Sequence, residues 1–219
     1  MGFISRLTTA GLLALAAGGG YRLLNNRNPQ KLTALGNASR QPAPIEYEYF
    51  SPGDDLERID ITELRATAQR LRGLRVPLNI AMYAFTDRAI AQVLVEDADA
   101  GAVIRVYRDG EQYQAEERDA QRHGRGSVTS MFRGHHNIHV RVKPASRVDL
   151  MHLKCWSDGK VLRDGSANWS PAGLKRQDND VNFTTDPQEV QKFNRDFEQM
   201  WDRSTNVRVQ CQRAARNRP

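Results

Sequence analysis

Short apolar stretches recur along the chain from residue 45 onward, and segments of helical periodicity separate several of them. Apolar runs of strand length occupy residues 45–50, 78–85, 103–107, 138–142 and 181–184. Strand, helix and strand in succession predict parallel pairing, with the helices packed against the sheet. The pattern therefore predicts an α/β domain, with a mixed, largely parallel β-sheet flanked by helices on both faces.

The first two helices are predicted from apolar residues that recur every three or four positions. Asp60 or Thr62 is the expected N-cap of the first, because a short polar side chain can accept a hydrogen bond from a free N–H of the first turn. Thr86 is the expected N-cap of the second, and Gly101 is the expected end of that helix.

The last predicted helix has the clearest start signal. Asp186 is the expected cap, Pro187 suits the first turn, and Glu189 completes a capping box. Its apolar face is formed by Val190, Phe193, Phe197, Met200 and Trp201. Within the polar segment 112–134, the first part is predicted to be helical and residues 124–126 to form a loop.

A second kind of pattern begins at residue 151, where charged and apolar side chains alternate. His152 and Lys154 are two positions apart, with Leu153 between them and Cys155 after them. Side chains in a strand point to opposite faces with a period of two. His152 and Lys154 are therefore expected side by side on one face, with Leu153 and Cys155 turned into the layer behind.

The next segment of the chain predicts a hairpin and a second polar cluster. Asp158 and Gly159 form a typical tight turn between two strands. Ser166 and Asn168 come at the next turn and bring a hydroxyl and a carboxamide to the same region. An imidazole, a cation and two neutral hydrogen-bonding groups are suited to binding and attacking a phosphate.

These residues resemble the signature of the phospholipase D superfamily, the HKD phosphodiesterases. The sequences HLK, DG, GSANWS and RQDND occur in this order within residues 151–180, and residues 81–86 and 103–109 are also similar to small bacterial members. The resemblance covers roughly residues 45–201. It implies a phospholipase D/nuclease-like fold and a phosphodiesterase activity.

The resemblance also implies a role for each matching residue. His152 would attack phosphorus to give a phosphohistidine, while Lys154 and Asn168 hold the non-bridging oxygens and Ser166 assists. Asp178 stands where the family often has an acid that orients a catalytic histidine.

One departure from the family pattern leaves a role open. The family usually has four residues between the lysine and its aspartate, whereas three separate Lys154 from Asp158. Because removing one residue from a strand reverses the face on which every later residue lies, Asp158 has no assured place in the site.

The chain has a single copy of the HLK and GSAN pair, although the family chemistry needs two histidines at one phosphate. The resemblance therefore implies a homodimer with its active site on the two-fold axis. It implies neither a cofactor nor a metal. His135 and His139 are four residues apart, but no helix, acid or cysteine is evident around them to complete a metal site.

The N-terminal segment differs from the rest of the chain. An apolar run from Leu7 to Gly20 predicts a signal peptide, and therefore a secreted or periplasmic protein; the alternative is an uncleaved membrane anchor. The predicted divisions are residues 1–20 for this leader, 21–44 for a linker, 45–203 for one catalytic domain and 204–219 for a basic tail.

Charge favours an anionic partner without choosing between two kinds. The net charge is +6 and the isoelectric point is near 9.6. Seven Arg or Lys against one acid in residues 118–147 favour nucleic acid, whereas the leader favours a phospholipid membrane surface. Phospholipid head-group hydrolysis is the first hypothesis, a nonspecific endonuclease is the alternative, and an inactive anion-binding module is the third.

Two further questions remain open from the sequence. Trp156 and Trp169 flank the motifs and are suited either to the core or to the mouth of the pocket. Cys155 and Cys211 could form a disulfide if the protein is exported to an oxidising compartment.

Overall fold

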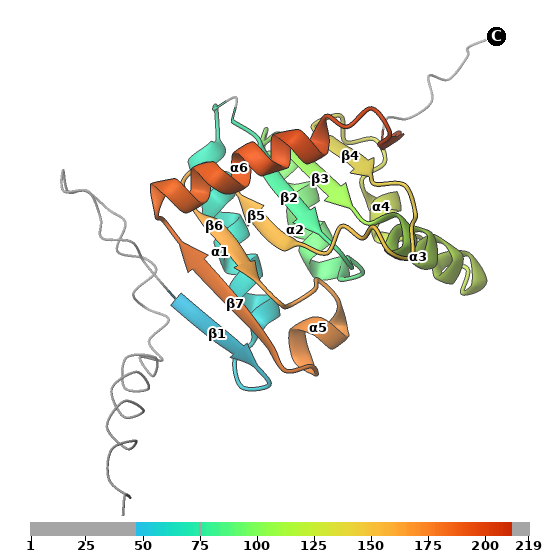
Figure 1. Cartoon of the computed structure of the whole chain (residues 1–219), viewed down its shortest axis with the longest axis horizontal. Coiled ribbons are helices and arrows are strands. Elements are labelled where there is room, and N and C mark those ends of the chain that lie inside the picture. The colour runs from blue at the N-terminus through green and yellow to red at the C-terminus, as the bar shows by residue number, and fades with distance from the viewer. Residues whose placement is uncertain (1–46, 75, 212–219) are drawn as a thin grey trace, which may run out of the picture. The chain divides into compact units, whose positions relative to one another are not determined.

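The computed structural model describes residues 47–74 and 76–211, which form a mixed sheet with helices on both faces (Figure 1). The strands are β1 (Tyr47–Ser51), β2 (Leu78–Met82), β3 (Ile104–Arg108), β4 (Ile138–Val142), β5 (Lys154–Ser157), β6 (Leu162–Gly165), β7 (Asn179–Thr184) and β8 (Val207–Val209). The helices are α1 (Leu56–Leu71), α2 (Arg88–Asp99), α3 (Gly110–Arg122), α4 (Val128–Met131), α5 (Pro171–Lys175) and α6 (Pro187–Trp201). The predicted α/β class is confirmed.

The sheet is less parallel than the pattern predicted. Its strand order is β1-β7-β6-β5-β2-β3-β4-β8. Within the described residues, only β2 with β3 and β3 with β4 pair in parallel, and every other neighbouring pair is antiparallel. Helical crossovers join the parallel strands, as strand-helix-strand spacing predicts. The prediction of a largely parallel sheet is wrong because β5, β6 and β7 follow one another as antiparallel neighbours, and β1 and β8 also pair antiparallel at the two edges.

Two apolar layers cover the two faces of the sheet. Strand alternation sends Ile80 and Val106 to the side of α1 and α2, and their neighbours Ala81 and Tyr107 to the side of α6. Figure 1 shows α6 crossing one face, with α1 and α2 on the other.

The two cysteines belong to different layers. Cys155 packs on the α6 side, Cys211 packs in the layer of α1 and α2, and both are buried free thiols. Burial raises the pKa of each thiol to about 11, which keeps both protonated at neutral pH. The disulfide considered from the sequence is therefore absent, because the sheet separates the two side chains.

Two of the three predicted N-caps are wrong, and the third is confirmed. The cap of α1 is Asp55, whose carboxylate accepts a hydrogen bond from the N–H of Arg58. The cap of α2 is Asp87 rather than Thr86. Asp186 caps α6 as predicted. The expected cap Asp60 lies instead within α1, with its side chain buried against the sheet.

The structure describes part of the C-terminal segment but not the N-terminal one. The predicted leader, residues 1–20, and linker, residues 21–44, lie outside the described residues. The predicted tail, residues 204–219, includes β8, which pairs with β4 at the edge of the sheet, and residues 212–219 lie outside the described part. Among the residues that the structure describes, no helix is long and apolar enough to cross a membrane.

A buried ion pair joins α1 to the centre of the sheet. Both side chains of the pair, Asp60 and Arg163, are fully buried, and their closest nitrogen and oxygen atoms are 3.0 Å apart. The indole N–H groups of Trp156 and Trp169 donate to the two oxygens of the same carboxylate, at 3.3 and 3.0 Å. Both tryptophans are fully buried, which places them in the core rather than at a pocket mouth.

We predict that Asp60→Ala lowers the free energy of unfolding by about 3–5 kcal/mol, because it leaves the Arg163 charge buried without its partner. Urea unfolding of the purified protein measures this loss. Asp99→Ala is the matched control: Asp99 pairs with His135 at 2.8 Å but is largely exposed, so its loss should stay within about 1 kcal/mol. Equal losses in the two variants would contradict the role given to the buried pair.

Candidate active site

An open pocket of about 430 Å³ lies where the start of β5 meets the end of β6 and the start of β7. Its lining residues are His152, Leu153, Lys154, Cys155, Asp164, Gly165, Ser166 and Asp180. The structure therefore brings the HLK segment and the start of the GSAN segment to one place, as the sequence predicted.

His152 and Lys154 are in direct contact at this pocket. The Lys154 Nζ atom lies 3.1 Å from both ring nitrogens of His152 and 2.7 Å from its carbonyl oxygen. His152 is exposed while Lys154 is buried, and this burial lowers the pKa of the Lys154 ammonium. An imidazole open to solvent and a cation fixed beside it are suited to an anionic substrate.

The alternation that predicted this contact extends only from Lys154 onward. Cys155 is buried as expected, but Leu153 is 38% exposed and does not enter the layer behind. The reason is that β5 begins at Lys154, so His152 and Leu153 precede the regular strand.

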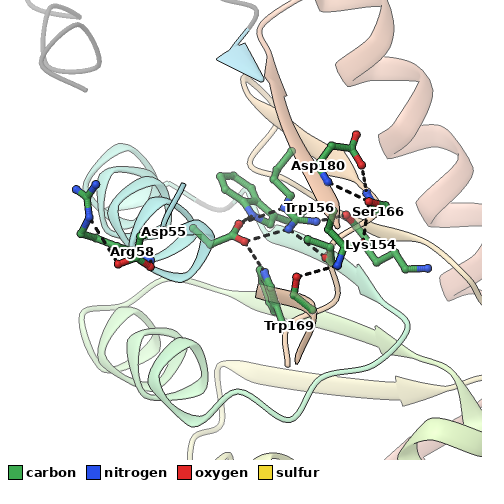
Figure 2. Close-up of polar contacts among 12 residues, drawn as sticks. Asp55, Arg58, Lys154, Trp156, Ser166, Trp169 and Asp180 are labelled. Carbon is green, nitrogen blue, oxygen red and sulfur yellow. Dashed lines mark hydrogen bonds and ion pairs between the residues drawn. The ribbon is translucent and has the colours of Figure 1, made fainter. Parts of the chain in front are cut away.

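Ser166 is held in the pocket by Asp180 of β7 (Figure 2). The Ser166 N–H donates to the Asp180 carboxylate at 2.9 Å, and the Asp180 N–H donates to the Ser166 hydroxyl oxygen at 3.0 Å. Burial alone would raise the pKa of Asp180, but the hydrogen bonds around it, from Ser166 and from the Asn182 side chain, together outweigh burial and the pKa is lowered. Asp180 is therefore an ionised carboxylate in the pocket at neutral pH.

Asp180, which the sequence did not single out, lines the pocket, whereas the predicted Asp178 does not. Asp178 is exposed, precedes β7 and does not line the pocket. The two acids are two positions apart, so alternation gives them the same face. What separates them is strand register, since Gly165 pairs with Val181 and brings the end of β6 against Asp180.

Gly165 permits this close approach. Its φ angle is +133°, and a Cβ atom at this position would lie 2.4 Å from the carbonyl oxygen of Asp180. Any side chain there would push β6 away from β7 and separate Ser166 from Asp180.

Asn168 does not line the pocket but fastens the second motif to the end of β2. Its carboxamide oxygen accepts a hydrogen bond from the N–H of Ala84 at 3.1 Å. The next residue, Trp169, accepts backbone hydrogen bonds from Thr86 and Asp87 at 2.7 and 3.0 Å. The segment after β2 is thereby tied to the GSAN turn.

Asp158 lies away from the pocket, at the turn between β5 and β6. Its buried carboxylate accepts hydrogen bonds from the N–H groups of Lys160 and Val161, and it forms an ion pair with Arg70 at 2.7 Å. This places it at the predicted hairpin turn rather than at the position of a site residue.

The buried side chain of Arg163 connects the HLK segment to the GSAN segment. Besides its pair with Asp60, its guanidinium donates to the carbonyl oxygens of Lys154 at 2.5 Å and Ala167 at 3.2 Å. Figure 2 shows Trp156 and Trp169 around the same carboxylate, with Lys154 beyond them. The ion pair thus holds one backbone oxygen from each half of the site.

The histidines outside the pocket form no metal centre. His135 bonds to Asp99 through Nδ1 at 2.8 Å. Across residues 47–74 and 76–211, no three His, Cys, Asp or Glu side chains are grouped to hold a metal ion.

Comparisons with known proteins point to one family. A family model described as "Cardiolipin synthase, PLD-like domain" matches residues 69–201. The mitochondrial cardiolipin hydrolase of Chlamydomonas reinhardtii is 26% identical over 126 residues, which cover 57% of this chain and 51% of that protein. The mitochondrial cardiolipin hydrolase of Danio rerio is 22% identical over 151 residues, covering 69% of this chain and 62% of that protein. The chain thus spans about half to three fifths of the length of these relatives.

Similarity also extends to solved structures. NucT from Helicobacter pylori superposes with a TM-score of 0.61 at 20% identity, covering 76% of this chain and 100% of that chain. At this level of identity the likeness supports the fold.

We predict that Gly165→Ala destabilises the protein by about 1–3 kcal/mol, because the added Cβ collides with the backbone of Asp180. Chemical unfolding followed by tryptophan fluorescence measures the loss. Gly101→Ala is the control, since Gly101 also has a positive φ angle, +100°, but nothing lies within 4 Å of its added Cβ. An equal loss of stability in Gly101→Ala would show that a collision with the backbone of Asp180 is not the cause.

Proposed function

Because the chain belongs to the phospholipase D superfamily, we propose that it is a phosphodiesterase whose nucleophile is His152. The observation that carries this proposal is the contact of Lys154 Nζ with the ring nitrogens of His152, at 3.1 Å, in a pocket shared with Ser166. A nucleophile, a cation and a hydroxyl at one pocket are the groups that a reaction at phosphorus would use.

The proposed reaction has two displacements at phosphorus. In the first, a His152 nitrogen forms a bond to phosphorus, the bond to the leaving oxygen breaks, and a second imidazole gives that oxygen a proton. In the second, a water molecule attacks phosphorus, gives its proton to the second imidazole, and the bond between phosphorus and His152 breaks. A covalent intermediate divides one difficult displacement into two easier ones.

The surrounding groups would stabilise charge on the phosphoryl oxygens. Lys154 supplies a positive charge. Asn168 does not line the pocket, so it would act indirectly, by fastening the GSAN turn through the hydrogen bond that its oxygen accepts from Ala84. Ser166 adds a hydroxyl. The Asp180 carboxylate, rather than Asp178, would orient an imidazole by accepting its N–H.

The second imidazole is proposed to come from a second copy of the chain. The reaction needs one histidine to attack and one to transfer protons, and the sequence has one HLK segment. A homodimer with His152 of each protomer facing one phosphate satisfies both needs with one motif.

A phospholipid is the substrate class that we propose first. Three exposed apolar side chains lie in sequence beside His152: Val148, Leu150 and Leu153 are 84%, 39% and 38% exposed. Such side chains suit contact with a lipid surface. The two curated relatives are cardiolipin hydrolases by name. The apolar run from Leu7 to Gly20 is the basis for proposing export or membrane anchoring.

An endonuclease is the second candidate. The excess of Arg and Lys in residues 118–147 favours a polyanion over a lipid head group. An inactive anion-binding module has less support, because the shortened spacing after Lys154 leaves its contact with His152 intact.

We predict that the protein, assayed in EDTA, releases head groups from vesicles of cardiolipin or phosphatidylcholine faster than it cleaves single-stranded or duplex DNA. His152→Ala should lower the rate at least about a thousandfold, because it removes the nucleophile. Phosphate-containing products are quantified by mass spectrometry. His136→Ala is the control, since His136 is exposed and does not line the pocket.

Each other outcome decides between the candidates. Cleavage of DNA without lipid turnover would establish the endonuclease, and absence of any turnover would favour the binding module. Activity that survives in His152→Ala would show that another group performs the chemistry.

A further inference from the structure

We infer that Tyr83 is a positioning residue whose ring fixes the His152 imidazole and the Lys154 ammonium relative to each other. The inference rests on the proposed function and adds to it a residue that does not line the pocket. It explains how an exposed imidazole outside the regular strand keeps one orientation.

One aromatic ring contacts both groups. The centroids of the Tyr83 and His152 rings are 4.5 Å apart, with 59° between the ring planes. The Lys154 Nζ atom lies 5.0 Å from the centroid of the Tyr83 ring and 3.1 Å from the His152 ring nitrogens. Tyr83, His152 and Lys154 therefore form a closed set in which each side chain contacts the other two.

Tyr83 is itself held at both ends. Its backbone N–H donates at 2.8 Å to the carbonyl oxygen of Leu153, the residue between His152 and Lys154. Its hydroxyl oxygen accepts a hydrogen bond at 3.1 Å from the side-chain amide of Gln112, which belongs to α3. The ring is thus fixed between the motif backbone and a helix, while the pocket side of His152 stays open.

The two contacts act on the two groups in different ways. His152 precedes β5, so no strand pairing restricts its side chain, and packing against the ring reduces the orientations it can adopt. Lys154 is buried, and the electron-rich ring face favours the ammonium form that burial disfavours. Loss of the ring should therefore misplace the nucleophile without removing any group that binds the phosphate.

The test compares kcat and KM for hydrolysis of bis(p-nitrophenyl) phosphate. Tyr83→Leu should lower kcat by about 10- to 100-fold with KM changed by no more than about twofold, as expected for a misplaced reacting group. Tyr83→Phe keeps the ring and should restore kcat to within about fivefold of the wild type. Tyr113→Leu is the control: Tyr113 is also half-buried and lies near Arg108, away from the pocket, and its kcat should stay near the wild-type value.

A second readout does not depend on turnover. In protein labelled with ¹³C-histidine, the Cε1–H resonance of His152 should carry a ring-current shift that Tyr83→Phe keeps and Tyr83→Leu loses. If the wild type hydrolyses no phosphodiester, the proposed function fails while this spectrum still tests the contact.

An unchanged kcat in Tyr83→Leu would overturn the inference. A loss of kcat in Tyr83→Phe as large as that in Tyr83→Leu would also overturn it. Should Tyr83→Leu not fold, Tyr83→Phe and Gln112→Ala decide the question. Both remove the same hydrogen bond, so the double variant should lose no more kcat than either single variant. Additive losses would overturn the inference, because they would show that Gln112 does not hold the Tyr83 ring in place.

Discussion

The arrangement of the site depends on one buried ion pair, between Asp60 of α1 and Arg163 of β6. Burying two charges is costly unless the pair is close and its remaining hydrogen-bonding groups are satisfied. The indole N–H groups of Trp156 and Trp169 donate to the two oxygens of the Asp60 carboxylate. The Arg163 guanidinium also donates to the carbonyl oxygens of Lys154 and Ala167. The pair therefore fixes the backbone of both motif segments, which makes it a positioning element as well as a core contact.

Above this pair, backbone geometry brings the polar side chains together. Lys154 at the start of β5 contacts His152 just before it, and the close contact of Gly165 with β7 sets Ser166 against Asp180. The segment after β2 contacts both motifs through Tyr83 and Trp169. A solvent-open imidazole thus lies next to a buried cation, an arrangement suited to an anionic substrate.

The sequence predicted those features that depend on neighbouring residues. The α6 cap, the parallel β2–β4 unit and the meeting of HLK with GSAN follow from local periodicity and turn residues. Features set by distant partners were missed. Asp60 resembles a helix cap in sequence, and only Arg163, 103 residues later, reveals it as a buried anion. Asp180 rather than Asp178 lines the pocket because of the register between β6 and β7. Strand β8 forms through its pairing with β4, which is distant in sequence.

In the proposed mechanism, His152 of one protomer attacks a phosphate, and His152 of its partner transfers protons to and from the same phosphate. The most direct measurement is to quench the protein in alkaline denaturant during turnover of bis(p-nitrophenyl) phosphate and to map the phosphoryl adduct by mass spectrometry. We expect an adduct on His152 alone, on no more than one of every two chains. An adduct on another residue, an adduct on every chain, or steady turnover by a protein that remains monomeric would contradict this mechanism.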